Sequence, residues 1–143
     1  MSEANASYKP LLVIQVGAAL LLMTVILFWP GPWNTQRWVG LLIAAPAMIM
    51  LLIARYQLGQ SFSVTPQARE LVTHGIYSKI RNPMYVFSAF MVAGFLLSLQ
   101  KPWFLLVLLI LIPAQIIRSR QESKLLEEKF GDAYREYREK TWF

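Results

Sequence analysis

The sequence predicts an all-α integral membrane protein with about four transmembrane helices and a C-terminal amphipathic cytosolic helix. Its 143 residues are 56% hydrophobic and only 15% charged, against the roughly 25% of charged residues that soluble domains carry. A helix crosses the hydrocarbon core of a bilayer in roughly 17 to 25 residues, and Arg and Lys side chains at its ends can reach the headgroups. Four uncharged stretches are about this long, and they lie between Lys9 and Arg37, Arg37 and Arg55, Arg81 and Lys101, and Lys101 and Arg118.

These stretches predict spans at Leu11–Trp29, Trp38–Tyr56, Met84–Leu99 and Trp103–Ile117. The first span is long and no small-residue cleavage site follows it, so we interpret it as a helix and not as a signal peptide. Tryptophans stand at the edges of the spans, as is typical of the membrane interface. The length of the chain suggests one domain, residues 1–143.

The basic residues fall mainly on one side of a four-span arrangement. That distribution follows the positive-inside rule and predicts that both termini and the loop Gln57–Pro83 are cytoplasmic. The net charge of +6 is then explained by topology and by contact with membrane lipids, so we expect no nucleic-acid partner. A bacterial inner membrane is favoured over the endoplasmic reticulum. With no cysteine in the chain, thiolate catalysis, disulfides and Cys-based metal sites are excluded, and we predict no metal site.

The tail after Arg118 changes character. Leu126, Phe130, Tyr134 and Tyr137 recur at helical spacing, with charges of both signs between them. This pattern predicts an amphipathic helix that lies on the membrane surface. Gly131 followed by Asp132 is typical of a place where one helix ends and another is capped.

Two polar clusters stand out from this apolar background. The first is RELVTHGIYSKIRNPMY, just ahead of the third span, and the second is RSRQESKLLEEKFGDAYREY, just after the fourth. Both fall on the inner side of the predicted topology, so they can meet there. A site made from both would be wet on one face and open to lipid on the other, which suits a charged cofactor and an apolar substrate.

The two clusters resemble signatures of the isoprenylcysteine carboxyl methyltransferase family and its phospholipid-methyltransferase relatives. The stretch LVTHGIYSKIRNPMY is similar to LVT-x-G-x-Y-x-x-x-R-[HN]-P-x-Y, and ESKLLEEKFGDAYREY is similar to E-E-x-x-L-x-x-x-F-G-x-x-Y-x-x-Y. The signatures share no residue and fall on either side of a helical hairpin of the expected length. The resemblance covers roughly Leu58 to Tyr137 and implies a cofactor core at about 58–137.

The resemblance implies S-adenosyl-L-methionine as cofactor, bound on the cytosolic side. By position, the family's contact to the carboxylate of the methyl acceptor maps onto Arg118, one helical turn before Glu122. An arginine there would hold and orient an anionic nucleophile. The family's cofactor contacts map onto Arg69, Glu70, Leu71, Val72, Tyr77, Asn82, Pro83, Met84, Tyr85 and Glu122.

The expected reaction is methyl transfer to a lipophilic acceptor, such as the carboxylate of a prenylated cysteine or a similar isoprenoid acid. Two departures from the signatures leave the acceptor open: Asn82 stands where the family often has His, and Ser123 replaces the second Glu. A phospholipid or other lipid amine N-methyltransferase is the close alternative. A nicotinamide-dependent enzyme like the sterol reductases, and a small transporter or scaffold, are further alternatives, although no predicted span has an ionisable residue in its middle. The sequence does not predict the oligomeric state.

Overall fold

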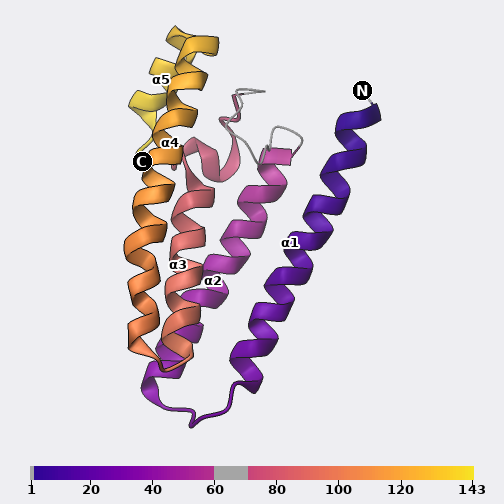
Figure 1. Ribbon diagram of the computed structural model, residues 1–143. Coiled ribbons are helices and arrows are strands. Elements are labelled where there is room, and N and C mark those ends of the chain that lie inside the picture. The colour runs from indigo at the N-terminus through magenta and orange to yellow at the C-terminus, as the bar shows by residue number, and fades with distance from the viewer. Residues whose placement is uncertain (1, 60–70) are drawn as a thin grey trace.

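The computed structural model describes residues 2–59 and 71–143, and the described part is built from helices (Figure 1). Helices α1 and α2 are followed by a 3-10 turn, η2, and then by α3. A second 3-10 turn, η3, leads into α4, and α5 follows. Their bounds are α1 Ser2–Phe28, α2 Thr35–Leu58, η2 Gly75–Ser78, α3 Pro83–Ser98, η3 Pro102–Val107, α4 Leu108–Phe130 and α5 Asp132–Lys140.

Each predicted span overlaps one of these helices, so the all-helical prediction is confirmed. Thr35–Leu58 and the continuous stretch Pro102–Phe130 are long and apolar enough to cross a membrane, while Leu12–Phe28 and Pro83–Ser98 are shorter apolar helices. The number of spans stays a prediction. The apolar part of α4 ends at Ile117, where the charged residues begin.

Helices α2 and α3 pack closely because small residues face each other where they cross. A Cβ atom added to Gly40 would come within 2.3 Å of Ser98 Oγ and 2.6 Å of the main-chain oxygen of Gly94. One added to Gly94 would meet the main-chain nitrogen of Ala44 at 2.5 Å. Small residues of this kind let the backbones of membrane helices approach. Here they allow α2 and α3 to cross in close contact.

The turn between α1 and α2 is stabilised by one buried arginine. The Arg37 guanidinium donates hydrogen bonds to the carbonyl oxygens of Gly31, Ile26 and Trp29 at 3.0, 2.6 and 2.9 Å. It also lies 4.2 Å from the ring centre of Trp33. The last carbonyls of a helix have no partners within the helix, so Arg37 caps the C-terminal end of α1 and sets the angle at which α2 leaves it.

The C-terminal part of the chain is helical, as the sequence predicts, and its place on a membrane surface stays a prediction. Helix α4 continues through the charged stretch to Phe130 and ends at Gly131, which has φ 54° and donates its N–H to Glu127 O at 2.8 Å. The predicted break at Gly131 is therefore confirmed. In α5, however, Tyr134 and Tyr137 are only 0% and 8% exposed, because these rings pack into the protein itself.

The two hairpin turns and the polar clusters lie at opposite ends of the molecule. Figure 1 shows the α1–α2 turn and the α3–η3 turn at one end, and η2 with α5 near the other. The two polar clusters therefore meet at one end of the bundle, as the sequence predicts.

Candidate functional site

The segment that leads into α3 is held in place from two sides. On one side, the main-chain N–H of Ile76 donates to Gln57 Oε1 on α2 at 2.8 Å. On the other, the Tyr137 hydroxyl of α5 donates to the carbonyl oxygen of Tyr77 at 2.8 Å, in a buried contact. The first polar cluster is thus fixed by the second, although 60 residues separate the two tyrosines.

A short parallel β-bridge between Ile80 and Trp142 adds main-chain contacts to this arrangement. The Trp142 N–H donates to Lys79 O at 3.2 Å, and the Arg81 N–H donates to Trp142 O at 3.3 Å. The Asn82 N–H donates to Phe143 O at 2.9 Å. The backbone just ahead of α3 is therefore part of a small two-segment structure and not an isolated loop.

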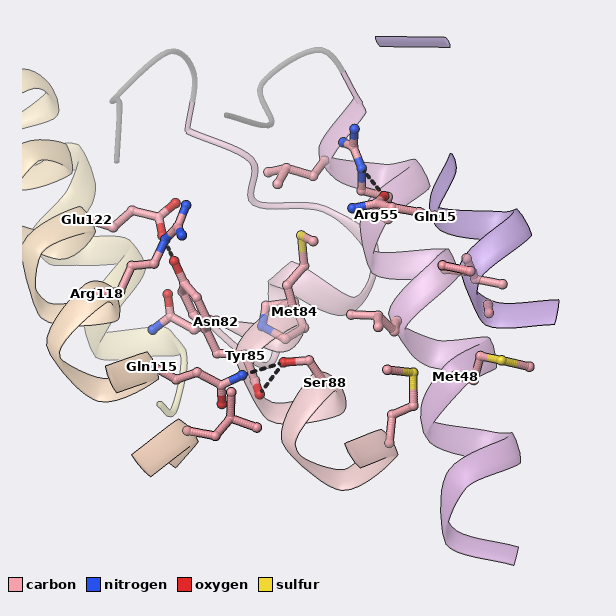
Figure 2. Close-up of a pocket in the computed structure, with 18 of the residues that line it drawn as sticks. Gln15, Met48, Arg55, Asn82, Met84, Tyr85, Ser88, Gln115, Arg118 and Glu122 are labelled. Atoms are coloured by element: carbon pink, nitrogen blue, oxygen red, sulfur yellow. Dashed lines mark hydrogen bonds between the residues drawn. The ribbon is translucent and has the colours of Figure 1, made fainter. Parts of the chain in front are cut away.

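A cavity of about 590 Å³ opens beside this segment and extends between the helices (Figure 2). This volume is in the range of small-molecule sites. Apolar residues of α1, α2, α3 and α4 form much of its wall, among them Leu22, Met48, Met91 and Leu111. Polar residues gather at two places. Figure 2 shows Glu122, Arg118 and Asn82 on one side, and Arg55 and Gln15 on the other.

The polar side centres on Glu122. The Tyr85 hydroxyl of α3 donates to Glu122 Oε2 on α4 at 3.0 Å, and the Arg118 guanidinium lies beside both groups (Figure 2). Glu122 stands beyond the apolar part of α4, and burial raises the pKa of its carboxyl, a shift that the hydrogen bond from Tyr85 and the charge of Arg118 oppose. The carboxylate is thus held where a cationic partner would relieve the cost of its burial.

Two further groups prepare this side of the cavity for a polar ligand. Asn82 is buried, and among the described residues its Nδ2 atom has no hydrogen-bond partner. Buried polar atoms are nearly always paired, so the amide is suited to an acceptor atom on a ligand. Burial and the nearby carboxylate of Glu122 raise the pKa of Tyr77, so this hydroxyl remains a donor at all physiological pH values.

The structure brings most of the residues expected from the family signatures to this one cavity. Leu71 and Val72 are half-buried but do not line it, and Arg69 and Glu70 lie outside the described residues. The expected residues that do line it are Tyr77, Asn82, Pro83, Met84, Tyr85, Arg118 and Glu122.

Five polar residues of the wall were missed as site residues: Gln15, Arg55, Arg81, Ser88 and Gln115. Arg55 Nε donates to Gln15 Oε1 at 2.6 Å, and Gln115 Nε2 donates to Ser88 Oγ at 2.8 Å. Both glutamines are isolated polar residues in apolar stretches, and this signal could have found them. Arg55 was placed at the end of a span, where a charge is ordinary, so its burial was not predictable from the sequence.

Comparisons with known proteins show the family of the chain and a structure with a similar fold. The profile of the phospholipid methyltransferase family matches residues 35–133, which is most of the chain. Among solved structures, the chain is similar to the eukaryotic intramembrane Ras methyltransferase ICMT (isoprenylcysteine carboxyl methyltransferase), with a TM-score of 0.59 and 22% sequence identity.

That likeness concerns the fold and covers 94% of this chain but 51% of the eukaryotic one. The chain thus spans about half the length of the structure that it matches. The comparison with curated proteins finds no match. The profile match, supported by the shared helical fold, shows that the chain belongs to the phospholipid methyltransferase family.

Proposed function

We propose that this protein is a membrane enzyme that transfers the methyl group of S-adenosyl-L-methionine to a lipophilic acceptor. The observation that carries the proposal is the shared cavity: residues of both polar clusters and the apolar surfaces of four helices line one space. A water-soluble cofactor and a lipid-soluble acceptor can meet in such a space. Membership of the phospholipid methyltransferase family supports methyl transfer as the reaction.

The residues at the polar side fit this cofactor. When bound, it supplies an activated sulfonium methyl group, and it also carries a carboxylate, an ammonium, ribose hydroxyls and an adenine ring. Glu122 would accept from the ammonium or the ribose, and Tyr77 and Tyr85 would pack against the cofactor and donate hydroxyl groups. Buried Asn82, whose Nδ2 atom has no hydrogen-bond partner among the described residues, would donate to a cofactor acceptor atom. Pro83 and Met84 would form part of the wall, and Arg69, Glu70, Leu71 and Val72 are proposed as further contacts by their place in the signature.

Arg118 is proposed to orient the acceptor. A guanidinium binds a carboxylate through two parallel hydrogen bonds, which suits the carboxylate of a prenylated cysteine or a similar isoprenoid acid. A carboxylate oxygen would form the new C–O bond as the methyl–sulfur bond breaks, giving a methyl ester and S-adenosylhomocysteine. The nucleophile is already an anion, so no general base is needed and positioning would supply most of the rate enhancement.

A second candidate reaction is N-methylation of a lipid amine. The match to the phospholipid methyltransferase family favours this reaction. In that reaction a neutral amine forms the new C–N bond and the product loses a proton. Asn82, which stands where the family often has His, cannot take up that proton near neutral pH. This favours the carboxylate acceptor.

The proposed setting is a bilayer with both termini and the polar clusters on the cytoplasmic side, in a bacterial inner membrane. The charge distribution supports this orientation, because the basic residues concentrate on that side. Membrane lipids would then surround the apolar helices, and the acceptor would reach the cavity from within the bilayer.

Calorimetric binding of S-adenosylhomocysteine to the detergent-purified protein tests the cofactor proposal. We expect micromolar binding by the wild type and loss of binding by the Glu122→Ala, Tyr85→Ala double variant. Gln36→Leu serves as a control, since Gln36 bonds to Leu97 O at 3.3 Å and does not line the cavity. A folded wild type that binds no S-adenosylhomocysteine would overturn the proposal, and nicotinamide cofactors would be tested next.

A further inference from the structure

The cavity extends well below its polar side, toward the end of the molecule that carries the hairpin turns. Arg118 and Leu111 both line it, seven positions apart on one face of α4. Seven residues of helix rise by about 10.5 Å, so the cavity is about two helical turns deep at this wall. On every helix the lining residue farthest from the polar clusters is apolar, and these four residues are Leu22 of α1, Met48 of α2, Met91 of α3 and Leu111 of α4.

The crossing of α2 and α3 closes the cavity at this level. Ala44 lies one helical turn beyond Met48, and Gly94 lies three residues beyond Met91. A Cβ atom added to Gly94 would meet the main-chain nitrogen of Ala44 at 2.5 Å, so the two backbones leave no space for a ligand between them. The four apolar residues that precede this crossing therefore form a floor, and we call the space between Arg118 and this floor the apolar slot.

The walls of the apolar slot suit a hydrocarbon chain. Ser88 and Gln115 are polar, but Gln115 Nε2 donates to Ser88 Oγ at 2.8 Å, so these side chains bond to each other. The other residues that line the slot above its floor are small or aliphatic: Ala18, Ala19, Leu51, Leu52 and Ala114. Burying a charged group among such side chains is costly, whereas burying a hydrocarbon is favourable. The charged groups of the cofactor thus belong at the polar side, and the slot is left for an apolar ligand.

The position of Arg118 sets the direction in which an acceptor would lie. Glu122 stands one helical turn from Arg118 toward the polar clusters, and Leu111 stands two turns away in the opposite direction. An acid whose carboxylate is held at Arg118 would therefore have the cofactor on one side and the slot on the other. Its charged end stays at Arg118, so its hydrocarbon chain enters the slot.

We propose that the apolar slot binds the hydrocarbon chain of the methyl acceptor and that its floor selects the length of this chain, with Leu111 as a specificity-determining residue. The inference rests on the proposed function. It narrows the acceptor class to carboxylic acids with one chain that ends near the floor. A chain of this length buries all its carbons, while a longer chain must fold back or leave its last carbons outside, and these add nothing to binding.

Acceptors that share one head group and differ in chain length test this role. The series consists of N-acetylcysteine with an S-dimethylallyl, S-geranyl, S-farnesyl or S-geranylgeranyl chain. For the wild type, we expect kcat/KM to rise with each added isoprene unit until the chain reaches the floor, and then to stop rising.

Two substitutions of Leu111 should shift this limit in opposite directions. Leu111→Ala deepens the slot, moves the limit to a longer chain and raises the ratio of kcat/KM for the longest acceptor to that for the shortest by roughly tenfold. Leu111→Trp fills the slot, moves the limit to a shorter chain and lowers the same ratio by a similar factor. A general loss of stability would not shift the ratio in both directions. Met48→Ala deepens the slot from the opposite wall and should act as Leu111→Ala does.

Leu109 provides matched controls on the same helix. It is 70% exposed and does not line the cavity, so Leu109→Ala and Leu109→Trp should keep the wild-type dependence on chain length. Calorimetry with S-adenosylhomocysteine shows that each variant keeps its cofactor site.

Three results would overturn the inference, and they differ from one another. If the Leu111 variants bind S-adenosylhomocysteine and keep the wild-type dependence on chain length, the floor does not select the acceptor. If kcat/KM of the wild type is the same for all four chains, the slot holds another molecule, such as an acyl chain of a bilayer lipid. If the wild type binds no S-adenosylhomocysteine, or binds it and methylates none of the four acids, the proposed function fails and this inference falls with it.

Discussion

The hydroxyl of Tyr137 in α5 donates to the main-chain carbonyl of Tyr77 at 2.8 Å, in a buried contact. This bond joins the two polar clusters directly. It fixes the turn that carries Tyr77 into the cavity wall, and it does so from the last helix of the chain. The C-terminal helix is therefore a structural support of the candidate site.

Replacing Tyr137 with Phe should destabilise the protein and loosen the site. The variant leaves the buried carbonyl of Tyr77 without its donor, which costs about 1–3 kcal/mol of unfolding free energy. Because Tyr77 lines the cavity, S-adenosylhomocysteine should also bind roughly threefold to tenfold more weakly. The midpoint of thermal unfolding in detergent and calorimetric binding measure the two effects.

Tyr134 provides a matched control on the same helix. It is 0% exposed, and its hydroxyl has no hydrogen-bond partner among the described residues. Tyr134→Phe removes a polar group that is buried at a cost, so it should leave the unfolding midpoint unchanged or raise it. If Tyr134→Phe destabilised the protein as much as Tyr137→Phe, the bond to Tyr77 would not be the cause.

Cofactor binding should weaken as the pH falls, because Glu122 must be ionised to accept from a cation. Burial raises the pKa of its carboxyl above the ordinary value of 4.5, so binding is expected to decline as the pH falls through the raised value. The complex favours the ionised form, and so binding releases protons where the free carboxyl is partly protonated. Glu122→Gln should bind more weakly at neutral pH and lose this pH dependence, which calorimetry across a pH series measures.

The same raised pKa has the opposite effect on the stability of the ligand-free protein. Ionising a buried carboxyl costs free energy, so the stability that protonated Glu122 contributes is complete below pH 4.5 and is lost as the pH rises through the raised value. Thermal unfolding of the wild type and of Glu122→Gln should therefore diverge as the pH rises. An equal response of the two proteins to pH would contradict the assignment of the shift to Glu122.

Gly40→Ala should destabilise the crossing of α2 and α3. The added Cβ atom would lie within 2.6 Å of backbone atoms of Gly94 and Ser98, and overpacking of this kind costs about 1–3 kcal/mol. Gly17→Ala is the control, because a Cβ atom there meets nothing within 4 Å and alanine favours the helix by about 0.5–1 kcal/mol. Unfolding midpoints that moved in the same direction for both variants would argue against the close crossing.

Arg37→Ala should lower stability without changing the affinity for S-adenosylhomocysteine. The variant exposes the last carbonyls of α1 by removing bonds from a charged donor, at a cost of about 2 kcal/mol or more. Arg37 lies in the first turn of α2, the helix that begins at the end of the molecule opposite the polar clusters (Figure 1), and it does not line the cavity. Thermal unfolding together with calorimetry separates the two effects, and a large loss of affinity in a protein that remains folded would contradict the assignment.

The sequence predicts the helices of this protein well, because their positions are determined by local runs of residues. The runs without charge place the helices, and the third predicted span, Met84–Leu99, differs from α3 by one residue at each end. The convergence of Tyr85 and Glu122 was predictable only through the resemblance of both signatures to one family. No spacing along the chain indicates that these residues share a hydrogen bond.

The parts that were missed depend on contacts between distant segments. The bridge between Ile80 and Trp142 pairs backbones, which leaves no side-chain pattern in the sequence. The face of α5 that carries Tyr134 and Tyr137 is amphipathic whether it lies on a lipid surface or packs on a neighbouring segment, so its periodicity cannot distinguish the two. In the sequence, Ser88 is a single hydroxyl residue within an apolar helix. Only the folded structure shows that Gln115 lies opposite it.

Transfer of a labelled methyl group from S-adenosyl-L-methionine to a lipid-soluble product tests the central claim most directly. The purified protein would be incubated in lipid nanodiscs with N-acetyl-S-farnesylcysteine, and the organic phase would be counted before and after mild base. We predict labelled product in the wild type but not in the Glu122→Ala, Tyr85→Ala variant, and release of the label as methanol by base, as expected of a methyl ester. A folded wild type that binds S-adenosylhomocysteine but transfers no label to this acid would contradict the account.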